Sequence, residues 1–196
     1  MTTLTARQED ALREVAHLGS AQGASMLARL VGDVGVLVDV PVVLEANRWQ
    51  LGWLLGGRDV KVVAATFGIE GELRGQVWWV LKAEDAERVS RRLLSRPSVA
   101  GRLSTSARAA LAEASNIVVS CSLSAVGTMV HANLLPSTPE VHDLTVAELV
   151  GPPTEDTFRT VLAASFLATN TPAFAGWLVM LFDQATREEM LRRLGL

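Results

Sequence analysis

The chain contains two long segments in which apolar residues recur at the spacing of an α-helix. They span residues 5–31 and 104–130. At about 100° per residue, positions three and four apart fall on the same side of a helix. The apolar side of the first segment contains Leu12, Val15, Gly19, Met26 and Leu30, and that of the second contains Ala107, Leu111, Ala114, Val118, Ala125 and Met129. We therefore expect two long helices, each burying one stripe of side chains.

Runs rich in valine, leucine and aromatic residues follow each of these segments. Such runs are typical of β-strands. They cover residues 34–45, 60–67 and 75–81 in the first half of the chain, and 141–146, 158–169 and 174–182 in the second. A charged segment with helical character closes each half, at residues 84–94 and 184–194. The pattern predicts the same order of helix, strands and helix twice.

Individual residues also indicate an internal duplication. The interval from Gly75 through an apolar run to the pair Arg91-Arg92 recurs unchanged from Gly176 to a second arginine pair. Agreement across separate elements favours a repeat over chance similarity.

The duplication defines the fold class that we expect. It is α/β (α+β): a pseudo-two-fold duplicated αβ domain with a mixed or antiparallel sheet and two long helices on its surface. The single domain would cover residues 1–196, with repeat halves at about 1–96 and 102–196. Residues 95–101, which are rich in helix breakers, would join the halves.

Composition narrows the classes of function. The chain has 196 residues, of which 49% are hydrophobic and 20% charged, and its net charge is −3. These values suit one domain with a hydrophobic core. The basic residues form only short pairs near predicted helix ends, so we expect no nucleic-acid binding. A single cysteine, Cys121, excludes an internal disulfide. With no secretory signal pattern at the N-terminus, we expect a cytoplasmic protein.

One stretch is long enough to cross a membrane. Residues 117–139 contain no Asp, Glu, Lys or Arg, and about 20 apolar residues suffice for a span. However, this stretch also contains serines, Thr128, His131, Asn133 and two prolines. We expect a core helix followed by a strand, and no membrane span.

Polar residues gather on the side of each long helix that faces away from its apolar stripe. In the second helix they are Glu113, Asn116, Ser120 and Ser124, with the small residues Ala109 and Gly127 beside them. In the first helix they are Arg7, Asp10, Glu14, His17 and Ser25. Residues at i and i+3 share a helix face, so Glu113 and Asn116 could enter a partner's site together. Ordinary solvated helix faces are the alternative.

At these residues the chain resembles the CheC/CheX/FliY family of chemotaxis phosphatases. The family motif is Asp or Ser, three residues, Glu, two residues, Asn, twenty-two residues and Pro. The second copy has Glu113, Asn116 and Pro139, while Ala109 stands at the first position. The first copy has Asp10, Glu14 and His17 in place of Asn, and its proline, Pro41, falls one place late. The resemblance covers essentially the whole chain.

The resemblance implies hydrolysis of the aspartyl phosphate on a phosphorylated CheY-like response regulator. In that family the Asn orients the attacking water, and the Glu pairs with the regulator's phosphate-site lysine. The Mg²⁺ belongs to the regulator, so we expect this chain to bind neither a metal nor another cofactor. Glu113 and Asn116 would be the catalytic pair, and Asp10, Glu14 and His17 a degenerate second site. An imidazole differs from an amide in reach, and it protonates near neutral pH.

Two other classes of function stay open. The family's fold also serves non-catalytic adaptors, which would bind a response regulator, the receptor deamidase CheD or the flagellar switch. A hydrolase of small phosphates or acyl compounds is the other class. The chain has no Walker-type glycine loop, no Gly-x-Ser-x-Gly elbow and only three dispersed histidines, so we expect neither such an enzyme nor a metal site.

Overall fold

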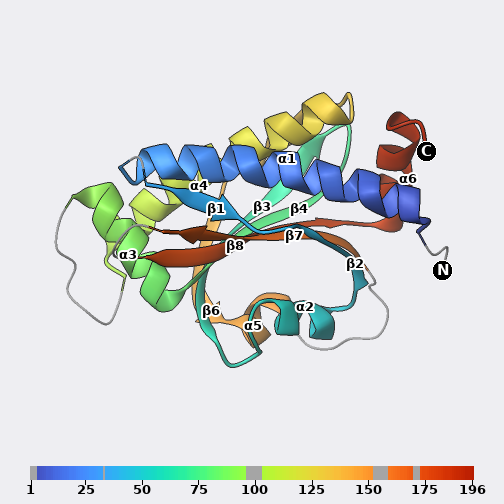
Figure 1. Ribbon diagram of the computed structural model, residues 1–196. Coiled ribbons are helices and arrows are strands. Elements are labelled where there is room, and N and C mark those ends of the chain that lie inside the picture. Colours follow the sequence, from blue (N-terminus) through green and yellow to red (C-terminus); the bar gives the residue numbers. More distant parts are fainter. Residues whose placement is uncertain (1–3, 33, 96–102, 152–158, 170–172) are drawn as a thin grey trace.

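A computed structural model describes residues 4–32, 34–95, 103–151, 159–169 and 173–196 (Figure 1). The first half contains, in order, α1 (Ala6–Leu30), β1 (Val36–Val38), β2 (Val42–Ala46), α2 (Arg48–Leu54), β3 (Lys61–Gly71), β4 (Gly75–Lys82) and α3 (Ala83–Leu94). The second half contains α4 (Thr105–Met129), β5 (Leu134–Pro136), β6 (Glu140–Thr145), α5 (Val146–Val150), β7 (Arg159–Ala168), β8 (Phe174–Phe182) and α6 (Gln184–Arg193). The same order of elements therefore occurs twice, as the fold prediction requires.

All strand pairs among the described residues are antiparallel. The strand order is β1-β7-β8-β4-β3-β5, with β2 also pairing with β7 and β6 with β3. The first two strands of each half thus complete the hairpin of the other half. The hairpin of each half, β3-β4 or β7-β8, therefore pairs with the first two strands of the other half, and the two halves are interlocked.

The pairing of β4 with β8 lies at the centre of the pseudo-symmetry. Trp78 stands opposite Val179 in this pair. Each is the third residue after the matching glycines, Gly75 and Gly176. Equivalent residues of the two halves therefore face each other, and the pseudo-two-fold axis passes between them. The predicted fold class, a duplicated αβ domain with an antiparallel sheet, is confirmed.

The two faces of the sheet carry different layers. On one face, α1 and α4 lie side by side (Figure 1), and the larger core includes Leu12 and Leu123 from these helices. On the other face, the short helices α2 and α5 pack over a smaller core. Because strand side chains alternate, Trp79 points into the first core and its neighbour Trp78 into the second.

The long helices begin where their sequences supply capping groups. The backbone N–H of Gln8 donates to the Thr5 hydroxyl at 3.3 Å, and the Gln8 side chain accepts from the backbone N–H of Thr5 at 3.0 Å. This reciprocal pair is a capping box. The Ser104 hydroxyl accepts from the backbone N–H of Ala107 at 3.1 Å at the start of α4. Both helices therefore start at the same place in their repeats.

Several expected boundaries differ from the structure. The single strand expected at 34–45 is two strands, because Pro41 has no N–H for a ladder and the Asp39 carboxylate accepts the N–H of Val40. The helices α2 and α5 and the short strand β5 were not expected. Val146, expected at the end of a strand, is the first residue of α5. Most of the expected linker, residues 96–101, lies outside the described part, as does Phe158.

Among the described residues, α4 is the one helix whose length and hydropathy would suit a membrane span. Its buried side, which includes Leu111, Val118 and Leu123, belongs to the main core. It packs along α1 and also contacts α3 and β5. The helix is therefore a core helix of this domain and is followed by a strand, as expected.

Candidate functional site

Glu113 and Asn116 lie on the outward side of α4. Glu113 is exposed and Asn116 half-buried. Neither side chain makes a hydrogen bond or an ion pair with any other residue that the structure describes. Ser120, half-buried, and Ser124, exposed, continue the same polar stripe toward the end of the helix. The carboxylate and the amide are thus adjacent, rigidly based and free to contact a second molecule.

The buried side of α4 follows the prediction only in its first half. Ala107, Leu111, Ala114 and Val118 are buried, but Ala125 and Met129 are only half-buried. Toward its end the helix also contacts the β5 strand, and Leu123, Val126 and Gly127 become the buried positions.

The two small residues beside the polar stripe have different surroundings. A Cβ added at Gly127 would lie 2.5 Å from the carbonyl oxygen of Ala132. Gly127 therefore serves the turn that follows α4. Ala109, in contrast, is exposed beside Glu113.

The prolines of the two motif copies occupy equivalent places. Pro139 immediately precedes β6, and Pro41 immediately precedes β2. The connection from helix to first strand covers residues 31–35 in the first half and 130–133 in the second, so it is one residue longer in the first. This extra residue explains why Pro41 comes one place late in the sequence.

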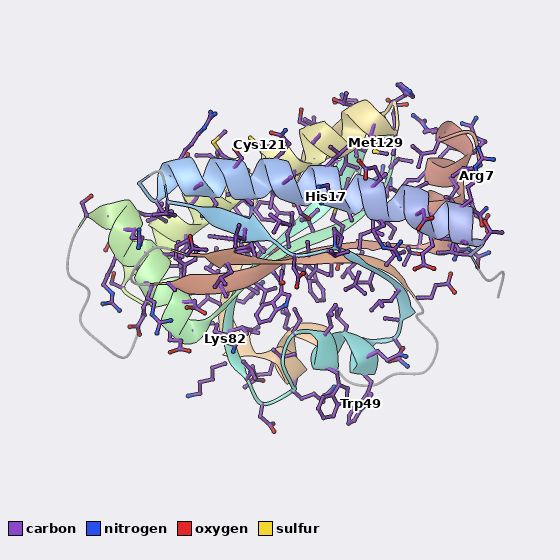
Figure 2. All side chains as sticks on the ribbon, viewed as in Figure 1. Arg7, His17, Trp49, Lys82, Cys121 and Met129 are labelled. Carbon is purple, nitrogen blue, oxygen red and sulfur yellow. The ribbon has the colours of Figure 1, made fainter. Side chains whose placement is uncertain are left out.

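The first copy of the motif lies on α1. Asp10, Glu14 and His17 are all exposed, and Figure 2 shows His17 near the middle of this helix. The Asp10 carboxylate accepts from the Arg13 guanidinium at 2.7 Å. Among the described residues, Glu14 and His17 have no hydrogen-bond or ion-pair partner. The predicted residues of the first motif copy therefore lie on one surface of α1, as those of the second copy lie on one surface of α4.

A shallow groove of about 330 Å³ runs between this part of α1 and the connection from β1 to β2. Asp10, Glu14 and His17 line it, together with Asp39. Asp39 stands two residues before Pro41, and Ser137 stands two residues before Pro139. The first site therefore carries an extra carboxylate where the second site carries a hydroxyl. Periodicity along α1 gave no signal for Asp39, because the groove forms only when the strands pair.

The described part of the chain holds no group of three or more His, Cys, Asp or Glu side chains arranged to bind a metal ion. His131 lies two residues after the end of α4, in the left-handed region, with φ of 51°. Its carbonyl oxygen accepts from the Arg193 guanidinium at 2.8 Å. The same guanidinium binds the carboxylates of Glu72 and Glu189. His131 thus belongs to a structural contact between α4, α6 and the turn from β3 to β4.

The fold and its surface define a class: a duplicated α+β protein with one polar motif on each of two adjacent helices. No protein-family model matches the chain. It is 31% identical over 140 residues to the CheY-P phosphatase CheC of Bacillus subtilis (strain 168), which covers 68% of this chain. The match spans 65% of the length of CheC.

Two solved structures share the fold. FliY of Thermotoga maritima has a TM-score of 0.76 at 15% identity, covering 99% of this chain and 98% of that one. CheX of Borrelia burgdorferi, in a complex with CheY, BeF₃ and Mg²⁺, has a TM-score of 0.57 at 12% identity, covering 87% and 97%. The sequence similarity to CheC supports placing the chain in the CheC/CheX/FliY-like family of chemotaxis proteins, and the two solved structures show that it shares their fold.

Proposed function

We propose that the chain is a phosphatase for the aspartyl phosphate of a CheY-like response regulator, acting in the cytoplasm. One observation carries the proposal: Glu113 and Asn116 stand side by side on the outward face of α4, without a partner in the described part of the molecule. The similarity to a CheY-P phosphatase supports this choice of substrate.

In the proposed reaction, Asn116 holds a water molecule in line with the phosphorus–oxygen bond to the regulator's aspartate. An amide both accepts and donates hydrogen bonds, so it can fix the water's orientation without adding a charge that repels the phosphoryl group. The water oxygen bonds to phosphorus, the bond to the aspartyl oxygen breaks, and aspartate and inorganic phosphate result. Mg²⁺ and a lysine on the regulator would stabilise the charge on the transferring group.

Glu113 has the docking role. An ionised carboxylate forms short, strong hydrogen bonds with an ammonium group, such as a lysine in the regulator's phosphate site. Because Glu113 precedes Asn116 by one helical turn, its contact would set the distance from α4 to the phosphoryl group. A rigid helix then places the amide with little loss of side-chain freedom.

The first site would be slower or inactive. His17 replaces the amide, and the groove contains an additional carboxylate, Asp39, while Arg13 in the same groove pairs with Asp10. A phosphorylated regulator carries a negative charge at its active site, and carboxylates close to it repel that charge. At the second site the residue in the place of Asp39 is Ser137, which is uncharged.

The test is the rate of phosphate release from a phosphorylated CheY-like receiver domain. Wild-type chain should accelerate release in proportion to its concentration. Asn116→Ala should reduce the maximal rate by about 100-fold with a small change in the half-saturating concentration. Glu113→Ala should mainly raise that concentration. If the wild-type chain leaves the receiver at its own rate of hydrolysis, the proposal is wrong.

An adaptor is the second candidate function, and His17 in the first motif favours it. Such an adaptor would bind a response regulator, CheD or the flagellar switch without catalysis. Asn116→Ala discriminates between the two, because an adaptor would keep its full effect on regulator signalling. A phosphatase would lose it.

A further inference from the structure

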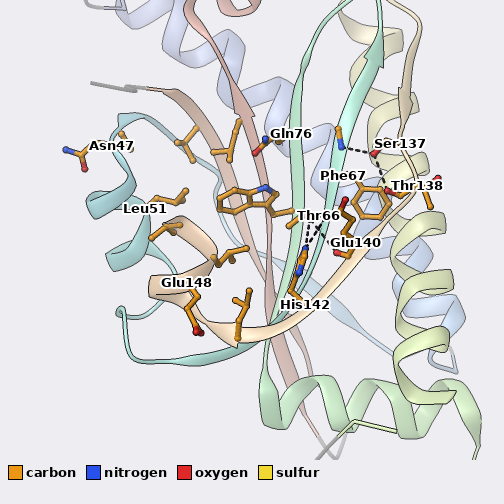
Figure 3. Close-up of a pocket in the computed structure, with 18 residues that line it drawn as sticks. Asn47, Leu51, Thr66, Phe67, Gln76, Ser137, Thr138, Glu140, His142 and Glu148 are labelled. Atoms are coloured by element: carbon orange, nitrogen blue, oxygen red, sulfur yellow. Dashed lines mark hydrogen bonds and ion pairs between the residues drawn. The ribbon is translucent and has the colours of Figure 1, made fainter. Parts of the chain in front are cut away.

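A second cavity lies on the face of the sheet opposite α1 and α4. Its volume is about 490 Å³, and it is bounded by the strands, α2 and α5 (Figure 3). None of Glu113, Asn116, Asp10, Glu14 and His17 lines it. The motif helices α1 and α4 lie on the opposite face of the sheet.

The cavity opens where apolar side chains on this face of β3 come to an end. Val62 and Ala64 point into the smaller core, and the next two residues on the same side are Thr66 and Gly68. A Cβ added at Gly68 would lie 3.6 Å from the Ser137 hydroxyl, which is an ordinary contact. Neither space nor backbone conformation therefore demands a glycine here. Because Gly68 has no side chain, the space above it forms part of the cavity.

Polar side chains from two halves of the chain meet in this hollow (Figure 3). The Nε2 atom of His142 lies 3.4 Å from the Thr66 hydroxyl and 3.5 Å from the Glu140 carboxylate. Thr66 and Glu140 are directly opposite in the pairing of β3 with β6. Gln76 lines the rim, and its amide has no hydrogen-bond partner among the described residues. Gln76 and Glu140 are exposed and His142 is half-buried, so these polar groups are accessible to a ligand that enters the hollow.

The charges select the kind of ligand. The charged groups among the described lining residues are the carboxylates of Glu140 and Glu148, beside His142, and no lysine or arginine is among them. The backbone N–H and the hydroxyl of Thr145 donate to the Glu148 carboxylate at 2.7 and 2.8 Å, which lowers the pKa of Glu148 and keeps it ionised. Such a lining repels phosphates and carboxylates and attracts cations.

The apolar part of the cavity lining indicates which other chemical groups the ligand carries. Leu144 and Leu149, which are half-buried, and the edge of Trp78 supply apolar surface next to the polar groups. Cavities of about 300–1,000 Å³ with apolar walls and a few polar groups are typical of small-molecule sites. The geometry points to a binding site for a small organic cation with an apolar body, whose ammonium group contacts Glu140 while its body packs near Trp78.

A matched pair of probes tests this inference. Tryptamine and 3-indolepropionate share an indole ring but carry opposite charges at neutral pH. Each is titrated into the ¹⁵N-labelled chain, and amide resonances are followed by NMR. Tryptamine should produce saturable shifts at Thr66, Gln76 and His142, and 3-indolepropionate should bind at least about tenfold more weakly.

Two variants locate the site. Glu140→Gln removes an exposed charge and should weaken tryptamine binding by about tenfold. Gly68→Leu should fill the hollow and abolish binding, while Gly68→Ala, which places only an ordinary contact there, should retain it. Equal binding of both probes, unchanged affinity in Glu140→Gln, or no saturable shift in the wild-type chain would overturn the inference.

Discussion

Replacement of Gly23 by alanine measures how closely α1 and α4 pack. In an exposed helix interior, this exchange stabilises a protein by about 0.5–1 kcal/mol. At Gly23 the added Cβ would lie only 2.3 Å from the Ser122 hydroxyl and 3.3 Å from Cγ1 of Val118. Real Cβ atoms essentially never approach another heavy atom to under 3.0 Å. Either the helices separate or the Ser122 hydroxyl rotates.

Both responses lower the free energy of unfolding. Overpacking a core costs about 1–3 kcal/mol. The Ser122 hydroxyl donates to the carbonyl oxygen of Val118 at 3.0 Å inside the core, and loss of such a bond costs about 1 kcal/mol. After subtraction of the propensity gain, we expect Gly23→Ala to destabilise the chain by about 1–2 kcal/mol. The melting temperature should fall by about 2–8 °C for a chain of this length.

Urea denaturation checks this value against a matched control. At Gly52 in α2, the nearest atom to an added Cβ is Cγ of the flexible Arg58 side chain, at 3.3 Å. Gly52→Ala should therefore be neutral or stabilising. Ser122→Ala combined with Gly23→Ala should recover at least about half of the loss, because the short contact is removed. If Gly23→Ala is as stable as Gly52→Ala, the close packing of the two motif helices is refuted.

Three further predictions concern the buried ion pair, the effect of pH and the first motif. Glu45→Ala should lower the free energy of unfolding by about 3–5 kcal/mol in urea melts, because it strands the guanidinium of Arg187, which is 5% exposed and pairs with Glu45. The two arginines that end α6 lower the pKa of Glu189 from its ordinary 4.5 to about 2. A lowered carboxyl pKa stabilises the fold above the unfolded-state value, so the wild-type urea midpoint should fall more steeply than that of Glu189→Gln as pH drops from 4.5 toward 2. Finally, His17→Asn added to Asn116→Ala should raise phosphate release at least about tenfold over Asn116→Ala alone.

Each of these predictions has a contrary outcome. Glu188 lies 3.8 Å from the same guanidinium and is mostly exposed, so Glu188→Ala should cost less than about 1 kcal/mol. An equal cost for Glu45→Ala and Glu188→Ala would remove the buried-pair explanation. If the urea midpoints of wild type and Glu189→Gln fall equally with pH, Glu189 does not contribute to the pH dependence of stability. If His17→Asn does not increase the rate, the missing amide is not what makes the first motif inactive.

The elements that the sequence predicts well are those whose patterns are long and local. The helix from Ala6 to Leu30 shows its buried and exposed faces over many turns, so a few misplaced residues change little. Asp10, Glu14 and His17 are exposed for this reason, as is Glu113. Their catalytic roles stay predictions. The motif and the family resemblance could be found from the sequence because they depend on spacing along one helix.

The features that the sequence concealed are short or non-local. The α5 helix, Val146–Val150, is too short to show a helical period, although Thr145 and Glu148 form a capping box that could have marked its start. The cavity beneath it depends on the pairing of β3 with β6, which come from different halves. Nothing local to His142 indicates that Thr66 will lie beside it. Asp39 was missed in the same way.

A single-turnover measurement tests most directly whether Asn116 delivers water to a docked regulator. A CheY-like receiver is phosphorylated, separated from its phosphodonor and mixed with an excess of the chain, and phosphate release is followed. With wild-type chain, the rate constant of phosphate release should rise with chain concentration to a maximum. Asn116→Ala should reach half of its maximum at a similar concentration, but that maximum should be about 100-fold lower. An Asn116→Ala maximum equal to that of wild type would contradict the assignment.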